Sequence, residues 1–232
     1  MTPLYSEMID MKEIAKNVFQ VPLMPRNSIN CYVIDDVLID AGIRSSGDKI
    51  LNAVRNLKIT RHVLTHAHAD HQGSSDRICR TLKIPLLTSE QERQSAETGN
   101  VTQEYPNSHH LVARFQQKFW AGKGHPVSGV LKEGDTVGSF TVIETPGHSK
   151  GHISFYREQD KVLIVGDTLV NMNLLTTIVG LNPPPELFTT DGKRNMESIR
   201  KIYDLKPRIL CFGHGPVLYE NGELELLLSR KA

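Results

Sequence analysis

The segment THAHADHQG, residues 65–73, places three histidines and one aspartate within six consecutive positions, His66 to His71. Imidazole and carboxylate groups are costly to bury unless something pairs with them, and a bound cation is the usual partner of such a cluster. The apolar run ITRHVL, residues 59–64, comes immediately before it and predicts a β-strand. The cluster is therefore expected at the end of a strand, where a cleft can form.

Three further polar side chains follow apolar runs in the same way. His148 follows FTVIETPG, Asp167 follows KVLIVG, and His214 follows RILCFG. A glycine stands directly before each of them, and glycine allows the backbone to turn sharply and to approach another group closely. These repeated strand ends predict that side chains distant in the sequence share one site.

The spacing of these residues indicates two cation positions. His66 and His68 are two residues apart and point the same way from an extended segment, whereas Asp70 and His71 lie in the turn beyond and face a second point. Five imidazoles and two carboxylates suffice for two cations that share one carboxylate. Zinc favours this set of nitrogen and oxygen donors, and a catalytic zinc site keeps a position open for water.

Composition and charge exclude several other classes of protein. The chain has 232 residues and a net charge of +1, which lacks the basic excess of a nucleic-acid binder. Its three cysteines are far apart and form neither a disulfide framework nor a CxxC site. The N-terminal residues contain no apolar signal region, and no run is long enough for a membrane helix. We expect a cytoplasmic protein that acts on a small molecule, away from membranes and nucleic acid.

The order of the predicted elements favours one domain over residues 1–232. Short β-rich runs alternate with helical patterns, of which residues 45–57, 74–84 and 191–205 are examples. Residues 89–127 differ, because they are polar and carry an amphipathic patch, HLVARFQQKFW. This segment is interpreted as a helical insertion that could roof the site. No repeat of fixed period is present.

The four motifs together resemble the metallo-β-lactamase superfamily over nearly the whole chain. HAHADH, TPGHSKGH, GDTL and GHG stand in the order of that family. The resemblance implies an α/β (α+β) fold, a four-layer αββα sandwich with the metals at one rim of its two sheets. It also implies the division of ligands: His66, His68 and His148 on the first metal, Asp70, His71 and His214 on the second, with Asp167 between them.

The resemblance further implies a dinuclear metallohydrolase. Two divalent cations, zinc with iron or manganese as alternatives, hold a bridging hydroxide and polarise the bond under attack. The candidate catalytic residues are Asp70, which orients the hydroxide or relays its proton, and His152, which in similar proteins supports the site without binding metal. Plain packing is the alternative for His152.

The motifs and the length of the chain indicate which branch of the superfamily it resembles. The motifs are similar to those of glyoxalase II, but only eighteen residues follow His214, too few for the C-terminal domain of that family. Lactamases of this family usually lack a carboxylate at the position of Asp167. A lactonase-like or glyoxalase II-like hydrolase of a small ester, thioester or lactone is expected. A sulfur dioxygenase, a phosphodiesterase, a β-lactamase and a non-enzymatic metal-binding domain remain as alternatives, and the oligomeric state stays open.

Several other side chains have two interpretations. Phe115, Phe119 and Trp120 either line an acyl pocket or pack the insertion onto the domain. His62 and Cys211 are expected to fill strands. A remaining group of histidines, all within the insertion, is expected to be exposed to solvent rather than to bind metal: His109, His110 and His125.

Overall fold

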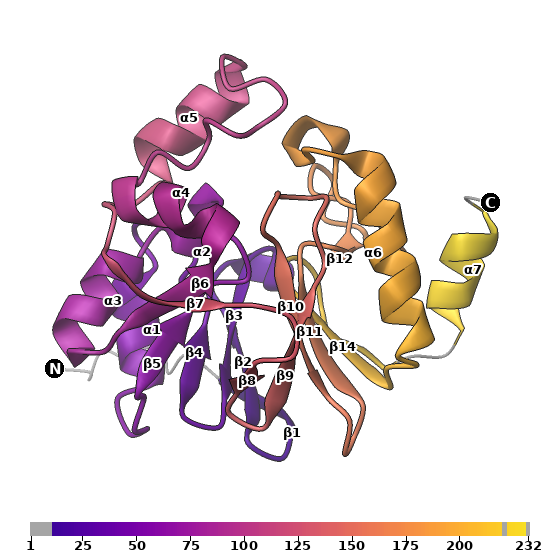
Figure 1. The fold of residues 1–232 in the computed structure, drawn as a ribbon, viewed down its shortest axis with the longest axis horizontal. Helices are drawn as coiled ribbons and strands as arrows, with labels where there is room; N and C mark the ends of the chain where they lie inside the picture. The colour runs from indigo at the N-terminus through magenta and orange to yellow at the C-terminus, as the bar shows by residue number, and fades with distance from the viewer. Residues whose placement is uncertain (1–10, 220–221, 231–232) are drawn as a thin grey trace, which may run out of the picture.

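The computed structural model describes residues 11–219 and 222–230. The expectation that no signal region is present concerns N-terminal residues of which 1–10 lie outside this range. Among the described residues, none of the helices combines the length and the apolar character that a bilayer crossing requires. Two large sheets stand side by side with helices on their outer faces, as Figure 1 shows.

The first sheet has seven strands in the order of the sequence. Its first four strands are antiparallel, and the pairs from β4 to β7 are parallel. The turn at Asp35 and Asp36 joins β3 to β4. The strands are β1 (Lys12–Ala15), β2 (Val18–Pro22), β3 (Asn30–Ile34), β4 (Val37–Ile39), β5 (Arg61–Val63), β6 (Leu86–Ser89) and β7 (Val127–Leu131).

The second sheet has six strands in the order β15-β14-β11-β10-β9-β8. Strands β11 and β14 pair in parallel, and the other pairs are antiparallel. A separate hairpin of two strands, β12 (Val170–Met172) and β13 (Val179–Asn182), follows β11. The strands of the second sheet are β8 (Thr136–Val137), β9 (Phe140–Glu144), β10 (Ile153–Arg157), β11 (Val162–Gly166), β14 (Ile209–Phe212) and β15 (Leu218–Tyr219).

Alternation of side chains along the strands builds the layers. In β14, Cys211 packs into the core between the two sheets, whereas Leu210 and Phe212 pack on the opposite face under α6 (Gly192–Asp204) and α7 (Glu223–Ser229). Successive strand residues point to opposite faces, so a sheet that is covered on both sides has apolar residues at every position. This explains why the β11 sequence VLIVG is buried throughout.

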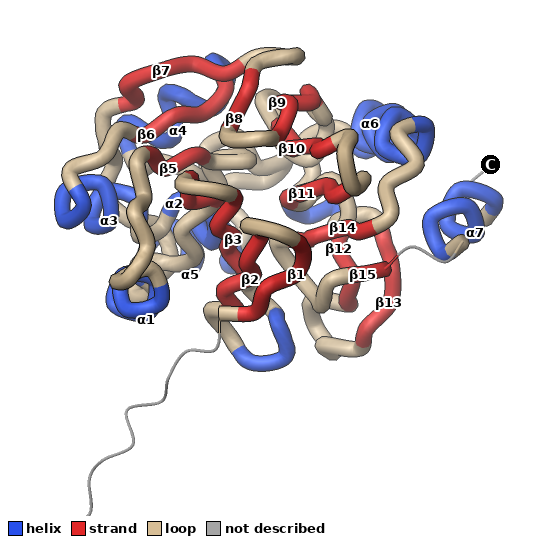
Figure 2. Tube along the Cα trace, turned by 90° about the horizontal axis from the view of Figure 1, so that it is seen from below, coloured by secondary structure: helices blue, strands red, loops and turns tan. Residues whose placement is uncertain are grey.

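Helices cover the outer faces of both sheets. The outer face of the first sheet packs against α1 (Gly47–Ala53) and α3 (Ser75–Leu82) through Ile50 and Ile78. Seen from below in Figure 2, these helices and α6 with α7 lie on opposite sides of the strands. The predicted αββα sandwich is therefore confirmed. The remaining helices are α2 (Ala69–Gln72), α4 (Arg93–Thr98), α5 (Leu111–Phe119) and the 3-10 helices Pro25–Asn27, Glu90–Glu92 and Glu186–Phe188.

The local predictions were accurate where capping residues mark an element. Helix α6 follows the predicted range 191–205, because the side chain of Asp191 accepts a hydrogen bond from the amide of Arg194. The helix predicted over 45–57 ends at Ala53 instead, and Ser46 makes no capping hydrogen bond. In the segment 89–127, helices α4 and α5 flank a run of turns.

Candidate metal centre

The cluster of residues 66–71 lies where β5 ends. His68 keeps an extended backbone, and α2 begins directly after it, at Ala69. The rings of His66 and His68 therefore lie near each other, with centroids 4.5 Å apart, while Asp70 and His71 are carried round the turn of α2. The change from extended chain to helix divides the cluster into two pairs, as the spacing predicted.

The second sheet brings its three polar side chains to the same place. His148 lies in the loop after β9, Asp167 directly after β11, and His214 shortly after β14. The glycine before His214 allows this approach, since a Cβ atom at Gly213 would lie 2.2 Å from Oδ1 of Asp167. Gly166 has a φ of +52°, in the left-handed region that glycine tolerates.

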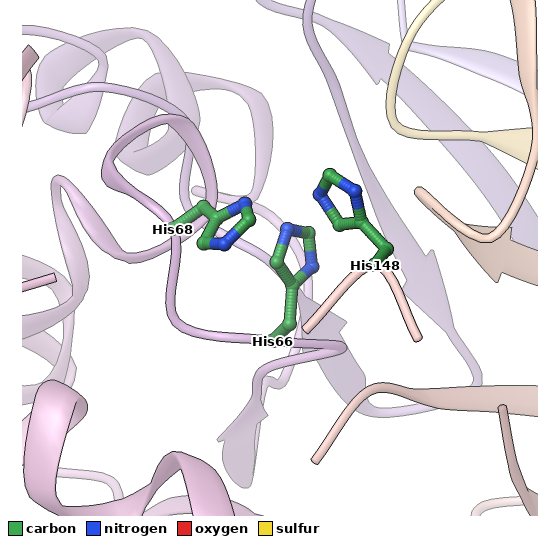
Figure 3. A group of neighbouring side chains, drawn as sticks. All are labelled: His66, His68 and His148. Carbon is green, nitrogen blue, oxygen red and sulfur yellow. The ribbon is translucent and has the colours of Figure 1, made fainter. Parts of the chain in front are cut away.

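The structure gathers all seven predicted ligands into three overlapping groups. Within each group, the donor atoms all lie within 4.8 Å of one another. Figure 3 shows the three rings of the first group turned toward one another. The grouping agrees with the division that the family resemblance implied, and Asp167 adjoins both sides. The groups are His66, His68 and His148; His66, His71 and Asp167; and Asp70, His71 and His214.

The carboxylate of Asp167 occupies the centre of the cluster. Its Oδ2 lies 3.0 Å from Nε2 of His214, 3.4 Å from Nε2 of His71 and 3.7 Å from Nε2 of His148. Burial opposes ionisation of Asp167, but the charges of His214 and His71 outweigh it and hold its pKa well below the usual range. This carboxylate is placed to contact cations on either side.

Unpaired buried atoms show that the cluster fits metal ions. Within the cluster, four buried polar atoms have no hydrogen-bond partner among the described residues: Nε2 of His66, His71 and His148, and Oδ1 of Asp167. Buried polar atoms without a partner are rare, and these four belong to one cluster of ligand-type groups. Cations would occupy the lone pairs that the protein leaves free.

Hydrogen bonds on the outer side of the rings orient them. Nδ1 of His71 donates to Asp40 Oδ2 at 2.9 Å, and Nδ1 of His214 donates to the carbonyl of Ser28 at 2.5 Å. A proton on Nδ1 leaves Nε2 free to bind metal. Asp40 also accepts from the amide of Thr65 at 2.8 Å. Sequence reasoning missed this role, although Asp40 follows the apolar strand β4 just as Asp167 follows β11.

Burial leaves several histidines neutral and ready to bind metal. It lowers the pKa of His148 to about 4, and it holds the pKa values of His66 and His68 well below the ordinary value. His214 behaves in the opposite way. Burial would lower its pKa, but the charge of Asp167 raises it to about 10. The carboxylates around His214 thus favour a positive charge at this position.

His152 lies behind the cluster rather than facing the cleft. Its Nε2 accepts a hydrogen bond from the amide of Asp167 at 3.0 Å, and its Nδ1 lies 2.8 Å from the hydroxyl of Thr145. Both ring nitrogens are therefore engaged within the protein. His152 is therefore placed to support the site, as a positioning residue that fixes the backbone of Asp167 rather than as a group that faces the substrate.

A cleft of about 300 Å³ opens over the cluster. Of the three aromatic residues predicted to line or to pack, only Trp120 lines the cleft, and it also packs against the core beside α1 and α3. Phe115 and Phe119 are half exposed, with ring centroids 5.0 Å apart. Sequence reasoning missed several lining residues, which come from distant segments: Met24, Ile29, Tyr105, Leu174, Leu175 and Phe188.

The other histidines lie outside the cluster. His62 is buried and contacts the carbonyl of Leu38 and the hydroxyl of Ser75, as expected for a histidine that fills a strand. His109 is exposed, as expected. Two expectations need correction: His110 caps α5, and His125 is half-buried against Asp76.

Comparison with known proteins places the chain in a family. The family model described as the metallo-beta-lactamase superfamily matches residues 24–214. A probable metallo-hydrolase of Bacillus subtilis, YybB, is 27% identical and covers 93% of this chain and 96% of its own length. The solved structure titled BLEG-1 B3 metallo-beta-lactamase aligns with a TM-score of 0.67 and 29% identity, over 87% of this chain and 93% of that one.

A second solved structure bears on the number of metals. TTHA1623, described as being in a di-iron-bound form, aligns with a TM-score of 0.64 and 26% identity, over 90% of this chain and 96% of that one. This relative therefore holds two irons. The matched motifs, the αββα layers and the gathered ligands agree, and the chain belongs to the metallo-beta-lactamase superfamily.

Proposed function

We propose that this protein is a hydrolase that binds two divalent cations and cleaves an ester, thioester or lactone bond of a small molecule. One observation supports this proposal above the others. The buried, unpaired atoms of His66, His71, His148 and Asp167 belong to one cluster, and His148 and Asp167 of this cluster line a cleft that a substrate can enter. A purely structural metal site is closed by its ligands, whereas this one adjoins open space.

The seven side chains divide naturally between two cations. His66, His68 and His148 would hold the first, and Asp70, His71 and His214 the second, with Asp167 shared. Bound cations of this kind lower the pKa of water and polarise the oxygen of the bond under attack. Zinc suits these donors, and the di-iron form of TTHA1623 keeps iron as an alternative, with manganese as a third.

Asp70 is the residue that we assign to orienting the attacking water. It lines the cleft, and its Oδ2 lies 3.3 Å from Nε2 of His214. Burial would raise its pKa, but the hydrogen bond from His214 and the charge of His71 bring it to about 2. Asp70 is thus ionised at neutral pH, so its carboxylate can accept a hydrogen bond from the attacking water and orient it.

Hydrolysis of β-lactams is the second candidate. The similarity to BLEG-1 over most of both chains favours it. Two features of this chain favour the ester-type reaction instead. Asp167 is present as a central carboxylate, and no lysine or arginine is among the described residues that line the cleft, where the carboxylate of a β-lactam would need a partner.

The test is a substrate screen of the protein loaded separately with zinc, manganese and ferrous iron. Aryl esters, thioesters, lactones, β-lactams and phosphodiesters are compared, with His68→Ala as the inactive control. We expect hydrolysis of at least one ester-type substrate by the wild type and its loss in the control. Turnover of β-lactams alone would replace the proposal by the second candidate, and no hydrolysis in any metal form would reject both.

A further inference from the structure

The cleft over the metal cluster has an ionic floor and apolar walls. Among the described lining residues, those that carry charge or bind metal all belong to the floor: His68, Asp70, His148, Asp167 and His214. The walls contain three uncharged polar residues, Ser28, Gln116 and Thr177. All other wall residues are apolar or aromatic: Met24, Ile29, Tyr105, Val112, Trp120, Leu174, Leu175, Pro185 and Phe188.

Helix α5 supplies one wall from a single face. Val112, Gln116 and Trp120 line the cleft at intervals of four residues, which places them one above another on the helix. The opposite side carries Leu174 and Leu175, in the connection between β12 and β13. Figure 1 shows α5 and β12 on opposite sides of the upper rim of the sheets.

Apolar side chains continue from the walls to the mouth of the cleft. Val112 is 38% exposed and Leu175 is 95% exposed, and both line the cleft. Two exposed apolar residues on opposite sides of an opening offer a surface that a long apolar chain can cover as it leaves the cleft. The length of such a chain would therefore continue to contribute to binding beyond the floor.

Among the residues that the structure describes, none in the walls carries a positive charge that could accept an anionic group. Arg26 contacts one lining residue, because its guanidinium donates to the hydroxyl of Thr177 at 2.7 Å, but Arg26 is not itself among the lining residues. A carboxylate or phosphate that entered the cleft away from the floor would lose water without gaining an ion pair, which is unfavourable. The walls thus discriminate against charged acyl groups.

Gln116 provides the uncharged hydrogen-bonding group of the α5 wall. The residue is only 6% exposed, and its Oε1 has no hydrogen-bond partner among the described residues. Gln116 therefore adds a polar but uncharged side chain to the α5 wall, and this wall carries no charge that would select an anionic ligand.

We propose that the substrate is a neutral acyl compound whose acyl side is an apolar chain lying between the α5 wall and the β12–β13 connection. The reacting carbonyl lies at the metal floor, and the chain extends past Trp120 toward Val112 and Leu175. This inference rests on the proposed hydrolysis for the reaction, but the apolar, uncharged selectivity of the cleft is a separate property that binding alone can measure.

The first experiment compares matched esters with the metal-loaded protein. p-Nitrophenyl acetate, butyrate, hexanoate and octanoate form the length series, and the p-nitrophenyl half ester of suberic acid matches octanoate in length but ends in a carboxylate. We expect kcat/KM to rise by up to about fourfold per buried methylene. The suberate half ester is expected to fall at least roughly tenfold below octanoate, because its carboxylate lacks a partner.

The second experiment uses Trp120, the single tryptophan of the chain, as a probe of binding. Octanamide and the half amide of suberic acid, which are equal in length, are titrated while tryptophan emission is recorded. Octanamide should change the emission, and the charged half amide should not do so at the same concentrations. A change with octanamide but no ester hydrolysis would reject the proposed reaction and keep the cleft selectivity. Ester hydrolysis with no preference for chain length or charge would support the proposed reaction and reject the cleft selectivity.

Paired variants locate the selectivity on α5. Val112→Lys puts a cation at the mouth and should raise the suberate-to-octanoate ratio of kcat/KM. The control is Leu111→Lys at the adjacent residue, which is 77% exposed and does not line the cleft. This variant should leave the ratio unchanged. Equal shifts in both variants would overturn the assignment. A wild-type preference for the suberate ester that disappears in Arg26→Gln would also overturn it, since Arg26 would then be selecting anions.

Discussion

Glu92 accepts a hydrogen bond from the amide of Ala67 at 2.9 Å, and Ala67 stands between His66 and His68. The other carboxylate oxygen of Glu92 accepts from the amide of Gly151, also at 2.9 Å, in the loop that carries His148. Glu92 is buried, and burial raises its pKa. One side chain therefore joins the ligand loop of the first sheet to that of the second, although it belongs to neither loop.

Glu92→Gln should loosen both loops. One acceptor oxygen becomes an NH₂ group that faces a backbone N–H, so one hydrogen bond is lost and about 1–3 kcal/mol of stability with it. Metal affinity should fall roughly tenfold or more, as for other residues that orient ligands. Competition with a chromophoric chelator measures the affinity. Glu90→Gln, an exposed change in the same short helix, is the control, and equal affinities in both variants would disprove the bridging role.

Metal content tests the central position of Asp167. Seven ligands in two sets predict about two metal equivalents per chain after reconstitution. Asp167→Ala removes the carboxylate that lies within 3.7 Å of three ligand histidines, so the content should fall to about one equivalent or less. Elemental analysis after gel filtration measures it. One equivalent in the wild type and no change in the variant would reject the dinuclear assignment.

Catalysis and folding should separate between two variants. His68→Ala removes a ligand that the core does not need, so hydrolysis should fall by at least about a hundredfold while the chain stays folded. Val165 is fully buried under α6, so Val165→Asp buries an unpaired charge there. This variant should lower the free energy of unfolding by several kcal/mol. Circular dichroism and thermal unfolding follow stability. Near-normal turnover in His68→Ala would contradict the metal-dependent reaction.

Acid sensitivity should trace in part to His62, outside the cluster. Burial lowers its pKa from 6.5 to about 4, so the unfolded chain binds this proton more tightly than the folded chain does. The stability that His62 contributes as a neutral side chain is present above about pH 6.5 and is lost as the pH falls toward 4. The loss amounts to about 3 kcal/mol at most.

The measurement for His62 is a difference between two proteins. Urea unfolding of wild type and His62→Gln at several pH values cancels the titration of the histidines that both chains share. The difference in the free energy of unfolding should shift against the wild type between pH 6.5 and 4. A difference that is independent of pH would show that His62 titrates normally in the folded chain.

The seven cluster residues could be predicted from sequence because each stands where a strand ends. Asp167 and His214 directly follow a glycine at the end of an apolar run, and that pattern can be recognised without knowledge of the fold. Helix α6 was predictable for a similar reason, since Asp191 caps it locally. Local signals of this kind do not depend on what packs nearby.

The supporting residues and the cleft walls could not be predicted. Glu92 lies in a polar segment that gives no sign of its burial, and its partners are 25 and 59 residues away. Met24 and Leu174 line one cleft but come from opposite halves of the chain. Nothing periodic connects such residues, because only tertiary packing brings them together.

The origin of the ligands in both sheets makes a bound metal a cross-link. His66, His68, Asp70 and His71 follow strand β5 of the first sheet, whereas His148, Asp167 and His214 follow strands of the second. Metal ions can bind all of these ligands only when the two sheets are packed together in the folded chain. Binding therefore raises the free energy of unfolding by mass action, by about 1.4 kcal/mol for each tenfold excess of free metal over Kd. Resistance of the chain to proteolysis thus becomes a measure of the supply of metal around it.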